Sequence, residues 1–214
     1  MPRPFRSRPT PFTGTIVDPG RSPLPRFAAP ADESPDLGEI RSRPLDHAVE
    51  LRPKGERLLV HCFPGDSARS LAVAIHPADP ALAKARVSLS QSIVDALAVL
   101  ADLAGAVVEG SILDATLVVR PGFRVIGPTG APLANQLVVS DLPYLGGELI
   151  IGRPYGERRE MLATLIEGLN QPSLVGLTDL RPVEGAQAPI AAPRGMLLVV
   201  RSLHAGYTPR QVAR

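Results

Sequence analysis

The residues of this chain that could act as nucleophiles are few. Only two of its 23 basic residues are lysine, Lys54 and Lys84, and Cys62 is its single cysteine. A lysine amine becomes a nucleophile when burial or a nearby cation lowers its pKa toward neutral. Arginine stays protonated and cannot attack in this way, but its guanidinium group can bind a phosphate through two hydrogen bonds. The sequence therefore offers few nucleophiles and many groups that can bind phosphate.

The cysteine and the histidines do not form a recognisable catalytic set. His61 and Cys62 are adjacent in an apolar run, so in a strand they point to opposite faces and cannot work as a Cys–His pair. His47, His76 and His204 are scattered along the chain. The G-x-S-x-G, P-loop and H-E-x-x-H motifs are absent, as is a G-x-G-x-x-G motif after a strand. We predict that Cys62 is a small buried side chain and that each histidine is a surface or hydrogen-bonded core residue.

Composition excludes several classes of protein. At 214 residues, one domain is expected, and it is large enough to bury a core without a disulfide or a metal. The net charge of +2 indicates nothing about nucleic-acid binding. No apolar run approaches the roughly 18 residues of a membrane span, and the basic N-terminus lacks the apolar segment of a secretory signal. The single cysteine excludes an internal disulfide and a cysteine-cluster zinc site, which favours a reduced, cytoplasmic compartment.

Residues 1–44 differ in composition from the rest of the chain. They hold ten of the 24 prolines and seven arginines, without apolar periodicity. Proline fixes φ and removes a hydrogen-bond donor, so we predict a disordered or extended Pro/Arg-rich tail that packs poorly. The tail is interpreted either as a weak tether to the phosphate backbone of a nucleic acid or as a solvated linker.

Residues 45–214 alternate between strand and helix patterns. Apolar, β-prone runs predict strands, and apolar residues at helical spacing predict helices. The expected strands are 57–63, its hairpin partner 70–75, 107–113, 115–119, 136–142 and 195–203, and the expected helices are 90–103 and 155–169. The pattern indicates a mixed α+β domain whose strands are mostly antiparallel.

Residues 139–159 carry a more specific pattern. They read V-S-D-L-P-Y-L-G-G-E-L and, after two residues, G-R-P-Y-G-E-R-R. This resembles the adenylation domain of bacterial ATP-dependent DNA ligases, in which a strand reads roughly F-D-L-L-Y-L-D-G, followed by D-L and by G-x-P-x-x-E-R-R at the start of a helix. The matching residues are Asp141, Leu142, Tyr144, Leu145, Gly147, Leu149, Gly152, Pro154, Glu157, Arg158 and Arg159. The resemblance covers roughly residues 45–210. It implies a nucleotidyltransferase core of two mostly antiparallel sheets flanked by helices, with ATP and Mg²⁺ as cofactors, DNA as partner and a role in DNA repair.

The family's nucleophile motif, E-x-K-x-D-G-x-R, is only partly kept. Without a gap it aligns with residues 50–57, where Glu50, Gly55 and Arg57 fit. Arg52 stands in the position of the lysine that attacks ATP, and Lys54 stands in the position of the aspartate. Arg52 cannot form the covalent intermediate, so the resemblance implies a domain with little or no ligation activity.

Two further segments also lack residues that the family motifs contain. Residues 108–113 align with L-D-G-E-L-V, where Glu109 keeps the first acid and Ser111 replaces the second. Residues 196–201 align with E-G-V-V-A-K, where Met196 replaces a metal-side glutamate and Arg201 replaces the lysine. The family's S-R-x-G segment has no counterpart, and no oligonucleotide-binding barrel follows at the C-terminus. These losses predict a degenerate domain without a metal site. If a nucleotide still binds, the expected contacts are Glu50, Arg52, Lys54, Arg57, Glu109 and Arg201.

Other interpretations of the same residues remain open. With a two-residue gap, Lys54 becomes the nucleophile and the chain an active nucleotidyltransferase, because positions 52 and 54 share a face of an extended segment. Alternatively, Glu50, Lys54, Glu56 and Arg57 are a solvated, charged strand edge. In a third interpretation the domain is a non-catalytic protein-interaction module, its pocket closed by apolar residues such as Met196 and Leu197.

Overall fold

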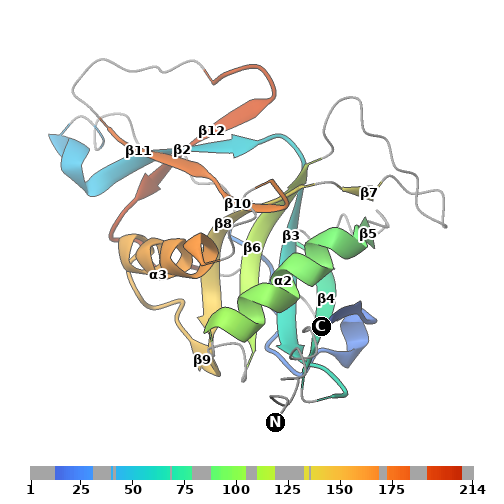
Figure 1. Cartoon of the computed structure of the whole chain (residues 1–214). Helices are drawn as coiled ribbons and strands as arrows, with labels where there is room; N and C mark the ends of the chain where they lie inside the picture. The colour runs from blue at the N-terminus through green and yellow to red at the C-terminus, as the bar shows by residue number, and fades with distance from the viewer. Residues whose placement is uncertain are drawn as a thin grey trace, which may run out of the picture.

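The structure is a computed structural model that describes residues 13–30, 40, 42–67, 69–78, 88–104, 110–118, 133–134, 136–168, 173–183 and 192–208. Within these ranges the chain forms a large sheet, a smaller three-stranded sheet and a short two-stranded pair, and helices α2 and α3 lie beside them (Figure 1).

The large sheet has seven strands in the order β1-β4-β3-β6-β8-β10, and β9 is added to β8. Strand β1 is parallel to β4 and β10 is parallel to β8, whereas the other neighbours are antiparallel. The strands are β1 (Thr13–Ile16), β3 (Glu56–Pro64), β4 (Ser70–Pro77), β6 (Ser111–Val118), β8 (Gln136–Leu145), β9 (Glu148–Leu149) and β10 (Val175–Leu177).

Helices α2 (Gln91–Ala104) and α3 (Tyr155–Glu167) lie on one face of this sheet (Figure 1). Successive side chains of a strand point to opposite faces, so Leu58, Val60 and Cys62 of β3 face the helices. They join a buried apolar core that includes Ile93 of α2 and Leu162 of α3. The short parallel pair of β5 (Ser88–Leu89) and β7 (Leu133–Ala134) precedes α2 and β8 in the chain.

The opposite face of the large sheet is covered by the N-terminal segment. After β1 this segment forms the 3-10 turn η1 (Pro19–Arg21) and then crosses the sheet. Leu24 and Ala29 pack against Leu59 and Phe63 of β3, together with Tyr207 from the C-terminal part of the chain.

The small sheet places β2 (His47–Pro53) between β11 (Asp179–Pro182) and β12 (Met196–Ser202), and both pairs are antiparallel. The 3-10 turn η2 (Pro44–Asp46) leads into β2, and Lys54 and Gly55 form the two-residue connection from β2 to β3. A Cβ atom at Gly55 would lie 2.1 Å from the carbonyl oxygen of Leu117, so only glycine fits where the chain crosses between the two sheets.

Most of the expected elements are confirmed, including the hairpin of β3 and β4, the two helices, and strands β8 and β12. Two predictions are wrong. Residues 111–118 form one strand rather than parts of two, and residues 105–109 and 119 lie outside the described ranges. Residues 13–30 are not a poorly packed tail, because β1 pairs with β4 and Leu24, Ala28 and Ala29 are buried. Residues 1–12 and 31–39 lie outside the described part of the chain.

Among the described residues, no helix is both long and apolar enough to cross a membrane.

Candidate functional site

Glu50 lies at the centre of a polar cluster on the inner side of the small sheet. Its side chain is fully buried, and one carboxylate oxygen accepts hydrogen bonds from Nη2 of Arg52 at 3.1 Å and from Nε of Arg201 at 2.9 Å. The other oxygen accepts from Oγ1 of Thr178 at 2.8 Å. Residues 50 and 52 share a face of β2 because they are two positions apart, and Arg201 comes from the neighbouring β12. Burial alone would lower the pKa of Arg201, but Glu50 outweighs this and raises it.

A second carboxylate, Asp114 on β6, lies on the inner face of the large sheet. Arg57 donates two hydrogen bonds to it, at 2.9 and 2.7 Å, and the hydroxyl of Tyr207 donates a third at 3.1 Å. Burial alone would raise the pKa of Asp114, but Arg57, and behind it Arg52 and Arg201, outweigh burial and hold the pKa below its usual range. Asp114 is therefore a carboxylate in the folded protein at neutral pH.

A third carboxylate, Asp141 on β8, completes the cluster. Arg158 from the first turns of α3 donates two hydrogen bonds to it, at 2.9 and 2.8 Å, and both side chains are at most 4% exposed. The neighbouring Arg159 is buried as well and donates to the backbone carbonyl groups of Val139 and Thr178. Helix α3 thus places two guanidinium groups in the space between the sheets.

Two tyrosines link these ion pairs. The guanidinium carbon of Arg158 lies 5.7 Å from the ring centroids of both Tyr155 and Tyr207, and that of Arg201 lies 5.6 Å from Tyr155. These are cation–π distances. Burial is the main cause that raises the pKa of both phenols, so each hydroxyl stays protonated and acts as a donor. The arginines, carboxylates and tyrosines form one connected set, which we call the inter-sheet network.

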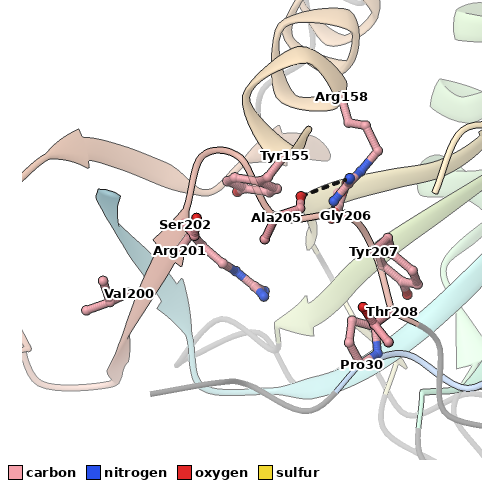
Figure 2. A pocket seen from close by; sticks show the side chains of 11 residues that line it. Pro30, Tyr155, Arg158, Val200, Arg201, Ser202, Ala205, Gly206, Tyr207 and Thr208 are labelled. Carbon is pink, nitrogen blue, oxygen red and sulfur yellow. Dashed lines mark hydrogen bonds and ion pairs between the residues drawn. The ribbon is translucent and has the colours of Figure 1, made fainter. Parts of the chain in front are cut away.

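A cavity of about 130 Å³ opens beside the network. Figure 2 shows Arg201 extending from β12 toward the segment that carries Tyr207 and Thr208, while Val200 points away. Arg158 reaches the same segment from the helix and donates to the carbonyl oxygen of Ala205 at 3.4 Å (Figure 2). The cavity is lined by Pro30, Asp141, Tyr155, Arg158, Val200, Arg201, Ser202, Ala205, Gly206, Tyr207 and Thr208.

The structure brings four of the six predicted nucleotide-binding residues together. Glu50, Arg52, Arg57 and Arg201 all belong to the inter-sheet network. Lys54 does not, because it is exposed in the connection from β2 to β3, where its backbone N–H donates to the carbonyl oxygen of Gly195 at 2.8 Å. The sixth residue, Glu109, lies outside the described ranges.

Two details of the alternative interpretations differ from the geometry. Of the four residues assigned to a solvated strand edge, Glu50 is 0% exposed on the central strand of the small sheet and Arg57 is only 18% exposed, whereas Lys54 is exposed. Met196 and Leu197 do not close the cavity described above, since neither lines it and Leu197 is 42% exposed.

Sequence reasoning missed several members of the network as site residues. Asp114 and Asp141 are single carboxylates within strands that are otherwise uncharged, and a charged residue in a buried strand requires a partner. That signal was available in the sequence. The roles of Tyr155 and Tyr207 could not be predicted from the sequence, because tyrosine is common in protein cores. Only the tertiary contacts place these rings beside the arginines.

Solved structures provide the comparison with known proteins. The ligase domain of LigD from M. tuberculosis superimposes with a TM-score of 0.51 and 21% sequence identity, over 92% of this chain and 55% of that domain. The chain is ligase-like in fold. A mycobacterial DNA ligase D complexed with ATP and MES is also similar, with a TM-score of 0.47 and 23% identity over 76% of this chain and 50% of that one. This chain therefore spans about half the length of the ligase structures it matches. No protein-family model and no curated protein matches the sequence.

Proposed function

We propose that this chain is a non-adenylating, DNA-ligase-like domain that binds phosphate-bearing ligands without forming a covalent intermediate. The observation that carries the proposal is the state of Arg52, the residue aligned with the ligase nucleophile. Its side chain is 2% exposed and is paired with Glu50 at 3.1 Å. Arginine remains protonated in proteins, so it has no lone pair with which to attack the α-phosphorus of ATP.

Lys54 is the alternative nucleophile, and its place in the fold weighs against that role. Adenylation requires the amine to form a P–N bond with the α-phosphate while pyrophosphate leaves, which calls for a low amine pKa and a fixed position. Lys54 is exposed at the connection between the sheets and outside the inter-sheet network. An exposed position does not supply the buried, fixed environment that this reaction requires.

The residues present do not fit the Mg²⁺ ion that the ligase resemblance implies. Magnesium prefers oxygen ligands, yet Met196 and Ser111 replace two of the expected carboxylates. The carboxylates of Glu50, Asp114 and Asp141 already accept hydrogen bonds from arginines. Among the described residues, no group of three or more His, Cys, Asp or Glu could hold a metal ion.

ATP fits the site only in part. Arg201 and Arg158 line the cavity and carry the positive charge that phosphate oxygens favour, but Arg158 already donates its paired hydrogen bonds to Asp141. The cavity they line is about 130 Å³, whereas sites that enclose a drug-sized ligand usually measure about 300–1,000 Å³. The proposal is therefore that phosphate groups of a nucleotide or a nucleic acid are bound, with the remainder of the ligand outside the cavity.

Intact-mass spectrometry tests whether the chain forms a covalent adduct with AMP. The purified chain is incubated with ATP and Mg²⁺ or Mn²⁺ and denatured before analysis, after a cooperative melting curve has shown that it is folded. We expect an unchanged mass. An AMP-sized increment that disappears in Lys54→Ala but persists in Lys84→Ala would overturn the proposal and establish an active nucleotidyltransferase.

A separate experiment tests whether the N-terminal arginines contribute to DNA binding. Residues 13–30 are packed on the sheet, so the test deletes residues 1–12 only, which removes Arg3, Arg6 and Arg8. If these arginines tether the chain to DNA, the deletion lowers affinity and flattens the dependence of log K on log salt. Unchanged affinity and slope would exclude the tether.

A further inference from the structure

Two histidines are stacked on the inner face of the large sheet. His61 of β3 and His76 of β4 have ring centroids 4.2 Å apart, with an angle of 39° between the ring planes. His61 is 1% exposed, and Nε2 of His76 is buried without a hydrogen-bond partner among the described residues. Protonation of both rings would place two positive charges side by side, so this arrangement favours neutral histidines.

The N-terminal segment covers this pair. Residues 17–30, which follow β1 and which we call the strap, cross the same face of the sheet. Oγ of Ser22 and Nδ1 of His61 share a hydrogen bond at 2.8 Å, and Leu24 is buried against Leu59 and Phe63 of β3. Because the strap bonds to His61 and packs beside it, release of the strap would expose the ring to water.

The strap is attached to the sheet mainly at its two ends. The N–H of Val17 donates to the carbonyl oxygen of Val73 at 2.9 Å, and the N–H of Ala29 donates to that of Ala78 at 3.1 Å. Between these ends the strap contains one regular element, the 3-10 turn η1. Segments with few regular hydrogen bonds to the core are those that open locally while the rest of a domain stays folded.

The docked strap disfavours protonation of both histidines. Burial is the main cause that lowers the pKa of His61 to about 3, and His76 and Arg26 lower it further. Burial also lowers the pKa of His76, with a further contribution from Arg26, whereas Asp18 acts in the opposite direction. Arg26 and Asp18 both belong to the strap, so its release removes these charges as well as the burial.

The strands on the other side of His61 add little charge. Ile112 of β6 is its partner in register, and Tyr144 of β8 is the partner of Ile112. Arg57 and Asp114 lie farther along the same face and are paired with each other at 2.7 Å. The protonation of the histidine pair is therefore coupled chiefly to the strap.

We propose that the strap is an acid-released cover: protonation of His61 and His76 frees residues 17–30 from the inner face of the large sheet while both sheets stay folded. Pro30, at the end of the strap, lines the cavity beside the inter-sheet network, so release also removes one wall of that cavity. The inference does not depend on the proposed function, because it concerns the docking of the strap and not the chemistry of the cavity.

The size of the effect follows from the difference in pKa between the docked and the released strap. A lowered pKa keeps His61 neutral while the strap is docked, so docking is favoured above pH 6.5 and weakens as the pH falls toward 3. If release restores the ordinary value of 6.5, His61 alone raises the ratio of released to docked strap about 25-fold between pH 7 and pH 5. His76 shifts in the same direction and increases this factor.

Hydrogen–deuterium exchange of the full chain, followed peptide by peptide at pH 7, 6 and 5, measures the release. Protection factors, which compare each rate with that of an unstructured chain at the same pH, remove the direct effect of pH on exchange. We expect the protection of residues 17–30 to fall at least about 25-fold between pH 7 and pH 5. Protection of the strap that does not depend on pH would overturn the inference.

Low concentrations of urea distinguish local release from unfolding of the whole domain. Local release exposes little surface, so exchange in the strap should respond weakly to urea below the unfolding transition. Peptides from α2 that exchange through global unfolding should respond strongly and should be better protected. Equal protection and equal urea dependence of the strap and α2 at pH 5 would show that the strap is released only when the domain unfolds, and the inference would fail.

Variants test whether the histidine pair is the trigger. His61→Gln should reduce the pH dependence of strap protection to the part due to His76, and the double variant with His76→Gln should abolish it. The matched control is His204→Gln, since the side chain of His204 is 71% exposed beside Asp46, and it should keep the full pH dependence. A double variant that behaves as the parent, or a control that loses as much as the double variant, would refute the assignment.

Two gentler variants cover the case in which His61→Gln does not fold. His76→Gln alters a partly buried side chain and should lower the pH dependence of strap protection. Ser22→Ala removes the hydroxyl group that bonds to His61, so it should reduce strap protection several-fold at every pH and leave the pH dependence in place. Strap protection that matches the parent in both variants, with the fold intact, would also contradict the inference.

Discussion

Replacing Glu50 by glutamine should destabilise the domain more than replacing its partner Arg52 by glutamine. Glu50 is the carboxylate that accepts from both Arg52 and Arg201, and it is fully buried. Glu50→Gln leaves two buried guanidinium groups, those of Arg52 and Arg201, without the carboxylate that they share. Arg52→Gln removes only one of these donors, and Arg201 and Thr178 still donate to Glu50.

The magnitude follows from the contacts of Glu50. Removing one partner of a buried ion pair usually costs about 3–5 kcal/mol, because the other charge stays buried. A glutamine can still accept from both arginines through its oxygen and donate to Oγ1 of Thr178 through its amide, so we expect the lower end, about 3 kcal/mol. For a chain of this size that corresponds to a fall of about 6–12 °C in melting temperature.

Urea unfolding at pH 7 and fixed ionic strength measures the change. The control is Glu148→Gln, whose side chain is 66% exposed and lies 3.5 Å from Arg153, and it should unfold with the parent chain. In the double variant, Arg52→Gln should restore part of the stability lost in Glu50→Gln, because it removes the charge left without its partner. A loss below about 1 kcal/mol in Glu50→Gln, or a larger loss in Arg52→Gln, would refute the charge argument.

Three further predictions concern the sheet faces. Burial, more than any neighbouring charge, lowers the pKa of His61 to about 3, so the folded chain excludes a proton that the unfolded chain takes up near pH 6.5. The free energy of unfolding should therefore fall as the pH drops below 6.5. In urea unfolding, His61→Gln should remove on the order of 2 kcal/mol of the loss between pH 7 and pH 5. An unchanged pH dependence in this variant would contradict the prediction. Leu24→Ala should lower the free energy of unfolding by about 2–5 kcal/mol because Leu24 is buried. The control Leu45→Ala, at an 86% exposed position, should unfold at the same urea concentration as the parent chain. Equal unfolding midpoints for the parent and both variants would mean that the N-terminal segment does not pack on the sheet. Gly55→Ala should lower the melting temperature because its Cβ would collide with the carbonyl oxygen of Leu117, and a normal melting curve would show that the turn can relax.

The sequence by itself determined the class of fold. Apolar periodicity placed the helices 155–169 and 90–103 and the hairpin of 57–63 with 70–75 to within a few residues, because these elements bury one face in a core and their spacing shows it. Strands β1, β2, β5, β7, β9, β10 and β11 were not predicted. Strand β2 contains Glu50 and Arg52, so it does not read as apolar, and the other six have at most four residues.

The replacement of a reactive lysine by Arg52 was also visible in the sequence, since it depends on residue type alone. Only the tertiary structure decided what surrounds that arginine. Glu50, Asp114 and Asp141 come from β2, β6 and β8, and their arginines come from β2, β3, β12 and α3, so no local pattern could pair them. The pairing of buried charges depends on distances across two sheets, and those distances are a property of the folded chain, not of spacing along it.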